Sequence, residues 1–574
     1  MNLVQSRSAD EAAPSSCRGR SICALVCLLV AASAFSLWVL RPVLANGFVH
    51  FDDDIYLAEL VRMGKFSLSS MRWMWSSLQP FYLQPIVWMT HLADYQLWGL
   101  DPTGHHLTNW LLHGVYVALV GTLVWLLTGK ANGVRLGERL AMSAGVALVC
   151  GIHPLQVESV AWVAARNGLL CSVWMVAALC AYIRAVSDGD EKKHGWWWTT
   201  VGLHAIALLT KPFAVSLPVV MLAVDFFPLR RHTRRSVWRL VGEKWLMIVM
   251  SGAAAVGAIA AQLYPEDVAE SALWVRILVA TRGAVFYLWK LVWPAWLSPF
   301  YPLGGQVSLH SPEFLVPFLV CLLVTGVAVW QWKKTPVLLT AWWSYLAVLL
   351  PVSGIAQSGG QAVADRYAYL AMVPALLAFA SGAVCVWRRG PLLKAALGAV
   401  LVAWLAFLGL RTRDQIAVWR DDPSLWGALL SHFPNDPMGN YNLGLAMLRN
   451  GHLLEARALV ERAVANTDPH ARPLPMARAT LGTIYLKTHS YSQAVDQLQQ
   501  AITANATLWA ARYNLACAYA RLGRLAESYG VLQEVLVSQP EYGSLAARDG
   551  ELAALRDNPE YATRFNALVG ISRK

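Results

Sequence analysis

Three consecutive carboxylates, Asp52, Asp53 and Asp54, form the longest uninterrupted acidic run in the chain. They follow shortly after an apolar stretch, residues 22–40, and their aromatic neighbours are Phe48, Phe51 and Tyr56. A carboxylate held against aromatic rings at a bilayer surface is costly unless it is protonated, paired or bound to a cation. Such a place suits a general base, because burial moves the pKa of a carboxyl toward neutrality. The alternative interpretation is a solvated loop or a helix N-terminal cap.

The composition is that of a membrane protein. Of the 574 residues, 56% are hydrophobic and 14% are charged, whereas soluble domains carry roughly 25% charged residues. The formal net charge is +12. Because the basic residues cluster between apolar segments, the positive-inside rule accounts for this charge, and it does not indicate a nucleic-acid partner. The cysteines are scattered without a CxxC pair, which argues against a disulfide framework or a zinc site.

Eleven apolar segments are candidate membrane spans. They are residues 22–40, 106–127, 138–153, 168–186, 196–210, 212–228, 245–262, 314–331, 336–351, 367–386 and 393–410. The first is long for the core of a signal peptide, so we interpret it as an uncleaved span. Alternation places the basic loops, among them "PLRRHTRRSVWRLVGEK" at 228–244, and the N-terminus in the cytoplasm. Asp52 to Asp54 then face the outer side.

Residues 275–294 are apolar but contain Arg276, Arg282 and Lys290. A charged side chain at mid-bilayer costs roughly 2.5–3.5 kcal/mol on insertion scales. We therefore predict an interfacial or re-entrant helix on the outer side.

The composition changes after Leu410, where charge rises and long apolar runs cease. Three copies of one pattern follow, at residues 441–464, 479–502 and 513–536. Small residues recur at matching positions: Gly444, Gly482 and Ala516, and then Ala456, Ala494 and Ser528. A helix–turn–helix unit with a period near 34 residues is typical of tetratricopeptide repeats. The sequence thus predicts an all-α chain with a polytopic membrane domain, residues 1–410, and a soluble α-solenoid of repeats, residues 411–574.

Several motifs in this order resemble a known family. "FVHFDDDIYL" is similar to the F-x-x-[YF]-D-D-x-x-Y element in the first outer loop of lipid-dependent glycosyltransferases of the GT-C class. The motifs that follow are "WGLDPTGHHLTNWLLH" (98–113), "GIHPLQVESVAWVAAR" (151–166), "LLTKPFAVSLPVVMLAVDFFPL" (208–229) and "VADRYAYL" (363–370). With the repeats, the chain resembles bacterial relatives of the transmembrane and tetratricopeptide-repeat-containing O-mannosyltransferases. It departs from them at Ala165, Asn167 and Gly168, where the family often carries charged residues.

The resemblance implies a GT-C-like fold of about 11 spans and an inverting enzyme that moves a sugar, mannose or another hexose, from a polyprenyl-phosphate donor to a protein hydroxyl. Asp52 and Asp53 are the candidate catalytic residues. The candidate substrate-binding residues are Tyr56, His106, Asn109, His113, His153, Glu158, Arg166, Lys211, Asp365, Arg366 and Tyr367. No cofactor is obligatory, and a divalent cation on Asp52 and Asp53 is left open.

Side-chain spacing supports part of this assignment. His106, Asn109 and His113 share one helix face, as a hydrogen-bonding cavity wall would require, or as ordinary packing residues would. Glu158, Trp162 and Arg166 are expected on a second stripe, either on an amphipathic surface helix or with Arg166 facing a lipid phosphate.

Two cations are candidates for phosphate binding. Lys211 lies at the outer end of a span, where it can snorkel or hold a phosphate oxygen. Arg366, next to Tyr367, matches phosphate oxygens with its fork, unless it simply pairs with Asp365.

The repeats would offer a groove to an acceptor polypeptide. The expected partners are therefore membrane lipids, the lipid-linked sugar and an acceptor protein, with the acids and repeats in a bacterial periplasm. Two alternatives stay open: a glycan or lipid acceptor, and a non-catalytic membrane-tethered scaffold.

Overall fold

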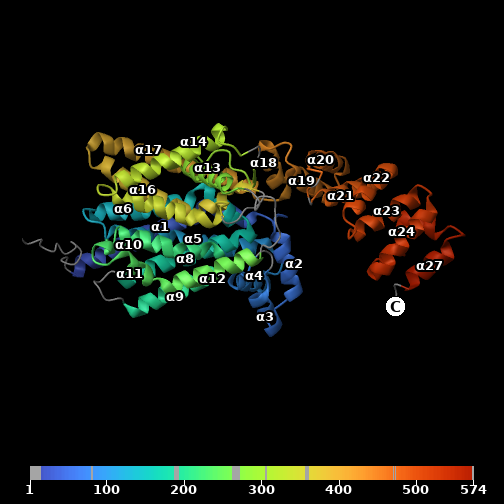
Figure 1. The fold of residues 1–574 in the computed structure, drawn as a ribbon, viewed down its shortest axis with the longest axis horizontal. Helices are drawn as coiled ribbons and strands as arrows, with labels where there is room; N and C mark the ends of the chain where they lie inside the picture. The colour runs from blue at the N-terminus through green and yellow to red at the C-terminus, as the bar shows by residue number, and fades with distance from the viewer. Residues whose placement is uncertain are drawn as a thin grey trace, which may run out of the picture. The chain divides into compact units, whose positions relative to one another are not determined.

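The computed structural model describes residues 15–78, 82–186, 193–261, 272–303, 307–355, 361–469, 471 and 473–571. The chain forms two compact units, residues 1–421 and 422–574. The first is the membrane unit and the second the repeat unit (Figure 1). Helix α17 (Pro391–Val418) runs through the boundary that composition suggests near residue 410.

The membrane unit is almost entirely helical. Its helices are α1 (Ser15–Leu40), α2 (Asp53–Met63), α3 (Leu68–Ser76), α4 (Pro85–Trp98), α5 (Pro102–Thr128), α6 (Leu136–Ile152), α7 (Val157–Ala161), α8 (Arg166–Val186), α9 (His194–Leu208), α10 (Leu217–Phe226), α11 (Val237–Gly242), α12 (Trp245–Ala261), α13 (Leu273–Val292), α14 (Pro312–Trp330), α15 (Pro336–Leu349), α16 (Ala368–Trp387) and α17. The 3-10 turns are η1 (Arg41–Ala45), η2 (Pro154–Gln156), η3 (Val163–Ala165), η4 (Pro212–Ser216), η5 (Arg231–Thr233), η6 (Leu350–Val352) and η7 (Asp365–Tyr367). Two short strands, β1 (Tyr301–Pro302) and β2 (Gln361–Val363), pair antiparallel.

Every predicted span contains a helix, but the count of about eleven spans is not confirmed. Among the described residues six helical stretches are long and apolar enough to cross a membrane, and a bent pair makes a seventh. They are Gly19–Ala45, Pro102–Thr128, Val163–Val186, Pro312–Trp330, Asp365–Trp387 and Pro391–Val418, with Leu136–Ile152 plus Pro154–Ala161 as the pair. Helices α9 and α10, at 15 and 10 residues, are shorter than the roughly 20 residues that a bilayer core requires.

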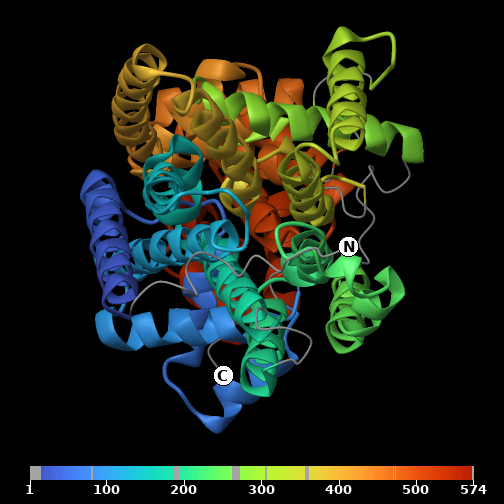
Figure 2. The same cartoon turned by 90° about the vertical axis from the view of Figure 1, so that its left-hand side faces the viewer.

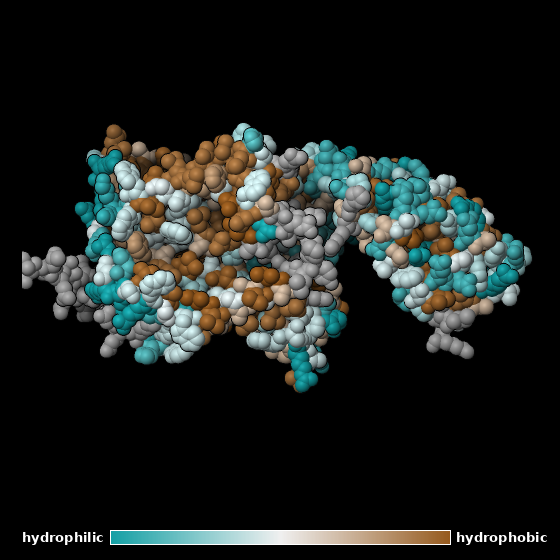
Figure 3. Space-filling model, viewed as in Figure 1, coloured by the Kyte–Doolittle hydropathy of each residue, from teal (hydrophilic) through white to brown (hydrophobic). Residues whose placement is uncertain are grey.

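Helix α8 lies at the centre of the bundle. Its side chains are enclosed by α5 on one side and α9 on another, and these helices run side by side in Figure 1, with Figure 2 giving the view from one end. The apolar window of the α8 stretch is 83% buried, whereas that of α17 is 6% buried. Figure 3 shows hydrophobic residues over the middle of the unit and more hydrophilic ones toward its ends. The chain is therefore a multi-pass membrane protein whose outer helices present apolar side chains to lipid.

Helix α13, the segment with three internal cations, contacts several spans in succession. Cys321 of α14 meets its Thr281 carbonyl, the Tyr345 hydroxyl of α15 donates to its Ala284 carbonyl, and Trp404 of α17 donates to its Val292 carbonyl. This order of contacts fits a helix that lies across neighbouring spans. The interfacial placement of α13 stays a prediction.

The repeat unit consists of paired helices. They are α18 (Asp422–His432), α19 (Pro437–Arg449), α20 (Leu453–Asn466), α21 (Leu474–Lys487), α22 (Tyr491–Ala504), α23 (Trp509–Arg521), α24 (Leu525–Ser538), α25 (Gly543–Ala546), α26 (Ala553–Arg556) and α27 (Ala562–Ile571), with 3-10 turns η8 (Pro540–Tyr542) and η9 (Gly550–Leu552). The small residues allow close packing as predicted. A Cβ on Gly444 would lie 2.6 Å from Val460, and one on Gly482 would lie 2.5 Å from Leu498.

Candidate functional site

The acidic loop is held by Asp53. Helix α2 begins at this residue, whose side chain is buried. One carboxylate oxygen accepts a hydrogen bond from the Val49 backbone N–H at 3.0 Å, and the other accepts from the Ala164 N–H at 2.8 Å. Burial nevertheless raises the pKa of Asp53 to about 7. With both oxygens engaged, Asp53 fixes the first loop against η3.

Asp52 has the opposite character. Its carboxylate is half-buried and accepts no hydrogen bond from the residues that the structure describes. Burial raises its pKa to about 6, the Arg366 charge works against this rise, and Asp54 adds to it. The backbone of Asp52 has φ 116°, in the left-handed half of conformational space that side chains other than those of Asn and Asp rarely adopt. Strain of this kind, roughly 1–3 kcal/mol, is found most often at functional sites.

Tyr56 and Lys211 are two further candidate residues, and each forms a hydrogen bond with a neutral side chain. The Tyr56 hydroxyl accepts a hydrogen bond from the Gln84 side chain at 2.9 Å. Lys211, half-buried after α9, donates to the Asn167 side chain at 3.1 Å. Burial, and then the Arg366 charge, lower the pKa of Lys211 to about 8. Asn167, one of the positions where the sequence departs from the family pattern, is thus the neutral partner of this cation.

Arg366 is bound by Glu158. The Arg366 backbone N–H donates to one Glu158 oxygen at 2.8 Å, and its guanidinium forms an ion pair with the other. The guanidinium lies 5.3 Å from the Trp162 ring centroid and 5.0 Å from that of Tyr367. Two aromatic faces and one carboxylate therefore orient the Arg366 guanidinium, whose charge lowers the pKa of Asp52.

Asp365 does not pair with Arg366, contrary to the simple alternative from sequence. Its carboxylate accepts a hydrogen bond from the Tyr301 hydroxyl at 2.9 Å. Tyr301 lies on β1, which pairs with β2 just before Asp365, so the two adjacent charged residues point to different neighbours.

Arg166 is enclosed in the protein and not directed at lipid. Its guanidinium meets the Asp94 carboxylate at 2.6 Å, the Asn109 side chain at 2.7 Å and the His105 carbonyl at 2.9 Å. The expected stripe of Glu158 and Arg166 is also wrong, because the chain passes from α7 through η3 to α8 between them and forms no single helix.

The three histidines face backbone carbonyls. His106 contacts the Gly47 carbonyl at 3.3 Å, His113 that of Gly151 at 3.0 Å, and His153 that of Leu291 at 3.0 Å. Asn109 donates to the carbonyls of Val160 and Trp162. The shared helix face of His106, Asn109 and His113 is confirmed, but its members hold the bend and the first loop in place.

The first loop also contacts the chain segment that leads into the repeats. Asn46 donates to the carbonyls of Ile416 and Trp419, and the Gly47 N–H donates to the Arg420 carbonyl at 2.8 Å. Aromatic rings join the same elements: the Trp162 centroid lies 4.9 Å from that of Phe51 and 5.7 Å from that of Trp419. We call Phe51, Trp162 and Trp419 the aromatic junction. It places the acid loop at the same end of the bundle as the exit of α17.

The divalent cation considered for Asp52 and Asp53 stays a prediction. No group of three or more His, Cys, Asp or Glu side chains is placed to hold one within the described part of the chain. Both oxygens of Asp53 are already engaged by backbone donors.

Sequence reasoning did not find Asp94, Tyr301 or Trp419. Asp94 and Tyr301 belong to no recognisable motif, so no local spacing marks them. Trp419 follows Ile416, Ala417 and Val418 at the end of a helical segment, where one further aromatic residue gives no signal.

The comparisons with known proteins agree with the two-part organisation. A model of the tetratricopeptide repeat matches residues 424–471 and 480–543. Protein O-mannosyl-transferase TMTC4 of Mus musculus is 24% identical over 422 residues, 64% of this chain and 56% of the relative. Protein O-mannosyl-transferase Tmtc3 of Drosophila melanogaster is 23% identical over 484 residues, 73% of this chain and 51% of the relative. The chain spans about half the length of these relatives. The chain is thus similar to TMTC-type protein O-mannosyl-transferases, and it carries tetratricopeptide repeats in its carboxy-terminal unit.

Proposed function

We propose that the protein is an integral-membrane glycosyltransferase that moves a sugar from a polyprenyl-phosphate donor to a hydroxyl of an acceptor protein. The names of its relatives support O-mannosyl transfer. The observation that carries the proposal is the Asp52 carboxylate, half-buried, without a hydrogen-bond partner among the described residues and in electrostatic contact with Arg366.

In the proposed reaction Asp52 is the general base. As the acceptor hydroxyl oxygen forms its bond to the anomeric carbon of the donor, the hydroxyl proton passes to the Asp52 carboxylate. The bond from the anomeric carbon to the phosphate oxygen breaks, and the polyprenyl phosphate leaves with the bonding electrons. Direct attack inverts the anomeric centre. Asp53 keeps the loop in place and takes no proton.

The two cations of this end of the bundle would neutralise the donor phosphate. Arg366 is oriented by Glu158 and two rings, whereas Lys211 has a neutral side-chain partner and forms no ion pair among the described residues. A buried cation with few partners gains strongly from a phosphate oxygen. The Arg366 contribution is shared with Glu158, and we assign Lys211 the larger part in binding the phosphate.

The repeats would bind the acceptor polypeptide in the same non-cytosolic compartment as Asp52, which in a bacterium is the periplasm. Support comes from the hydrogen bond between Gly47 and Arg420, because the chain leaves the bundle toward the repeats beside the acid loop. The basic segment 228–244 at the other end of α10 fits a cytoplasmic loop under the positive-inside rule.

Reconstitution in lipid nanodiscs with radiolabelled polyprenyl-phosphate sugars tests the proposal. We expect label to move to a protein acceptor at the outer face, with mannose tested first and other hexoses in parallel. Transfer only to an oligosaccharide or a lipid would show that the acceptor is a glycan or a lipid and not a protein. No transfer from any lipid-linked sugar to any of these acceptors would remove the enzymatic proposal.

A further inference from the structure

A cationic surface lies at the end of the membrane unit away from Asp52, on the segment 228–244. Arg230, Arg234 and Arg239 are exposed there and have no carboxylate partner among the residues that the structure describes. Arg230 and Arg234 precede the short helix α11, and Arg239 lies on it; Trp238 of the same helix is 84% exposed. Leu240 of the same helix is buried and holds it against the bundle.

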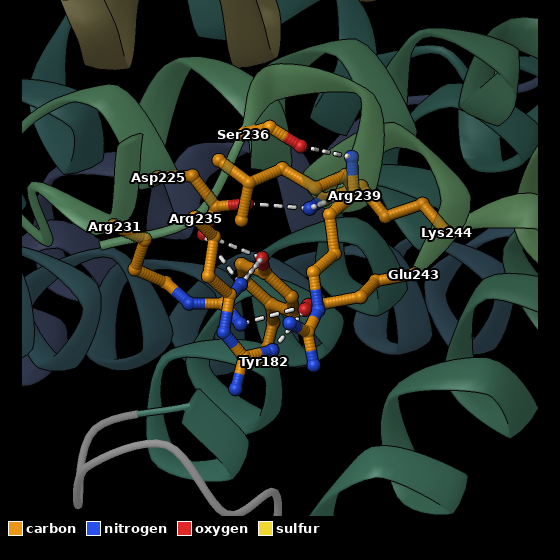
Figure 4. Close-up of polar contacts among 9 residues, drawn as sticks. Tyr182, Asp225, Arg231, Arg235, Ser236, Arg239, Glu243 and Lys244 are labelled. Atoms are coloured by element: carbon orange, nitrogen blue, oxygen red, sulfur yellow. Dashed lines mark hydrogen bonds and ion pairs between the residues drawn. The ribbon is translucent and has the colours of Figure 1, made fainter. Parts of the chain in front are cut away.

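The two acids of this region, Asp225 and Glu243, form ion pairs with neighbouring cations (Figure 4). Asp225, at the end of α10, is buried. It forms an ion pair with Lys244 and another with Arg231 at 3.1 Å, and accepts a hydrogen bond from the Tyr182 hydroxyl at 2.6 Å. This buried set joins α8, α10 and the start of α12.

Glu243 belongs to the same network, because it shares Arg231 with Asp225. It binds Arg231 at 2.7 Å and also forms an ion pair with Arg235. The region 225–244 contains six Lys and Arg residues and two acids, a net charge of +4. Because both acids are paired with the inward-facing Arg231, Arg235 and Lys244, three of the four excess positive charges are carried by the outward arginines.

The neighbouring loop adds to this surface. Trp332 stacks near Phe226 of α10, with ring centroids 5.8 Å apart. The exposed Lys333 and Lys334 follow it directly. We call the three arginines, Trp238, Lys333 and Lys334 the basic platform. It combines fixed cations with an exposed indole ring, and indole rings favour the headgroup region of a bilayer.

We propose that the basic platform binds the phosphate headgroups of anionic phospholipids in the leaflet opposite the acid loop. The segment lies between two apolar helices, α10 and α12, so lipid headgroups are the phosphates nearest to it. Arginine forks match phosphate oxygens, and Trp238 beside Val237 gives an apolar anchor that a free phosphate would not use. The inference does not depend on the proposed glycosyl transfer.

The test uses the full-length protein in nanodiscs of mixed zwitterionic and anionic phospholipid. Native mass spectrometry of the lipids retained after release from the discs measures the preference for the anionic lipid. A triple variant, Arg230→Gln, Arg234→Gln and Arg239→Gln, removes the central cations. A matched triple, Arg184→Gln, Arg389→Gln and Lys394→Gln, removes the same charge from exposed sites elsewhere.

We expect enrichment of anionic lipid on the wild type and on the matched triple. In the triple variant Arg230→Gln, Arg234→Gln and Arg239→Gln we expect this enrichment to fall, by about 5-fold for each arginine removed. Equal enrichment in both triples would overturn the proposal, as would no enrichment on the wild type. Thermal stabilisation by inorganic phosphate in purely zwitterionic discs, to the same extent as by anionic lipid, would also overturn it in favour of a soluble anion. All substituted side chains are exposed, and equal melting temperatures of the two triples would show that folding is not the cause.

Discussion

Replacing Asp52 and Asp53 one at a time by Asn separates the two roles that the geometry gives them. Asp52→Asn keeps the size of the side chain and suits the left-handed backbone at φ 116°, which Asn tolerates. It removes no hydrogen bond found among the described residues. We therefore expect unchanged folding and loss of the general base, a decrease of roughly 10²- to 10⁴-fold in the rate of sugar transfer.

Asp53→Asn should act through the structure. Its two carboxylate oxygens accept from the N–H groups of Val49 and Ala164. An amide offers one oxygen, and its NH₂ group would face the second N–H donor. One buried donor is then unpaired, at a cost of roughly 1–3 kcal/mol. The first loop should loosen, so both activity and thermal stability should fall.

The assay measures transfer from a radiolabelled polyprenyl-phosphate sugar in nanodiscs, donor binding by a separate filter method, and melting temperature. Asp54→Asn, on the exposed neighbour, is the control and should retain activity. Wild-type transfer by Asp52→Asn would refute the assignment of the base. Loss of donor binding with an unchanged rate at saturation would instead make Asp52 a binding residue.

Five further predictions concern pH dependence, phosphate binding, packing and the aromatic junction. Because a base must be ionised and the pKa of Asp52 is raised to about 6, kcat/KM should fall as pH drops below about 6; a pH profile that keeps this limb in Asp52→Asn would contradict the reasoning. The linked stability runs the other way: a raised folded-state pKa favours the protonated form, so this contribution is present below about pH 4 and is lost as pH rises through 6. Lys211→Met should raise KM for the donor roughly 10- to 100-fold and leave kcat less affected; equal KM values would remove the phosphate role. Gly482→Ala places a Cβ 2.5 Å from α22 and should destabilise the repeats by about 1–3 kcal/mol, whereas Gly530→Ala, with open space, should not; the reverse order in thermal melts would be inconsistent with the packing. Trp419→Ala should speed hydrogen exchange in residues 46–60, and unchanged exchange would show that the junction does not hold the loop.

Much of the fold could be predicted from sequence because its signals are periodic. Apolar runs give the helices of the membrane unit, and matched small residues give the repeat packing, since Gly482 admits no Cβ. The number of membrane spans was harder to predict from the sequence, because α9 and α10 are apolar but form only short helices. Hydropathy does not show where a 3-10 turn ends a helix.

Local spacing in the sequence identifies only part of the contacts in the candidate site. The acidic run marks the loop, but it does not distinguish Asp52 from Asp53, because their difference lies in distant backbone donors such as Ala164. Asp365 and Arg366 are adjacent in sequence yet bind Tyr301 and Glu158. Partners of this kind, brought together by tertiary packing, leave no trace in local spacing.

The hydrogen bonds from Asn46 and Gly47 to residues 416–420 join the first and the last segments that leave the membrane bundle. These contacts are made within the membrane unit, before the repeat unit begins at Asp422. The support of the acidic loop is therefore independent of the repeats that follow. Repeat arrays of different length or surface could be exchanged at this point, in evolution or by design, without altering the contacts that hold Asp52 and Asp53.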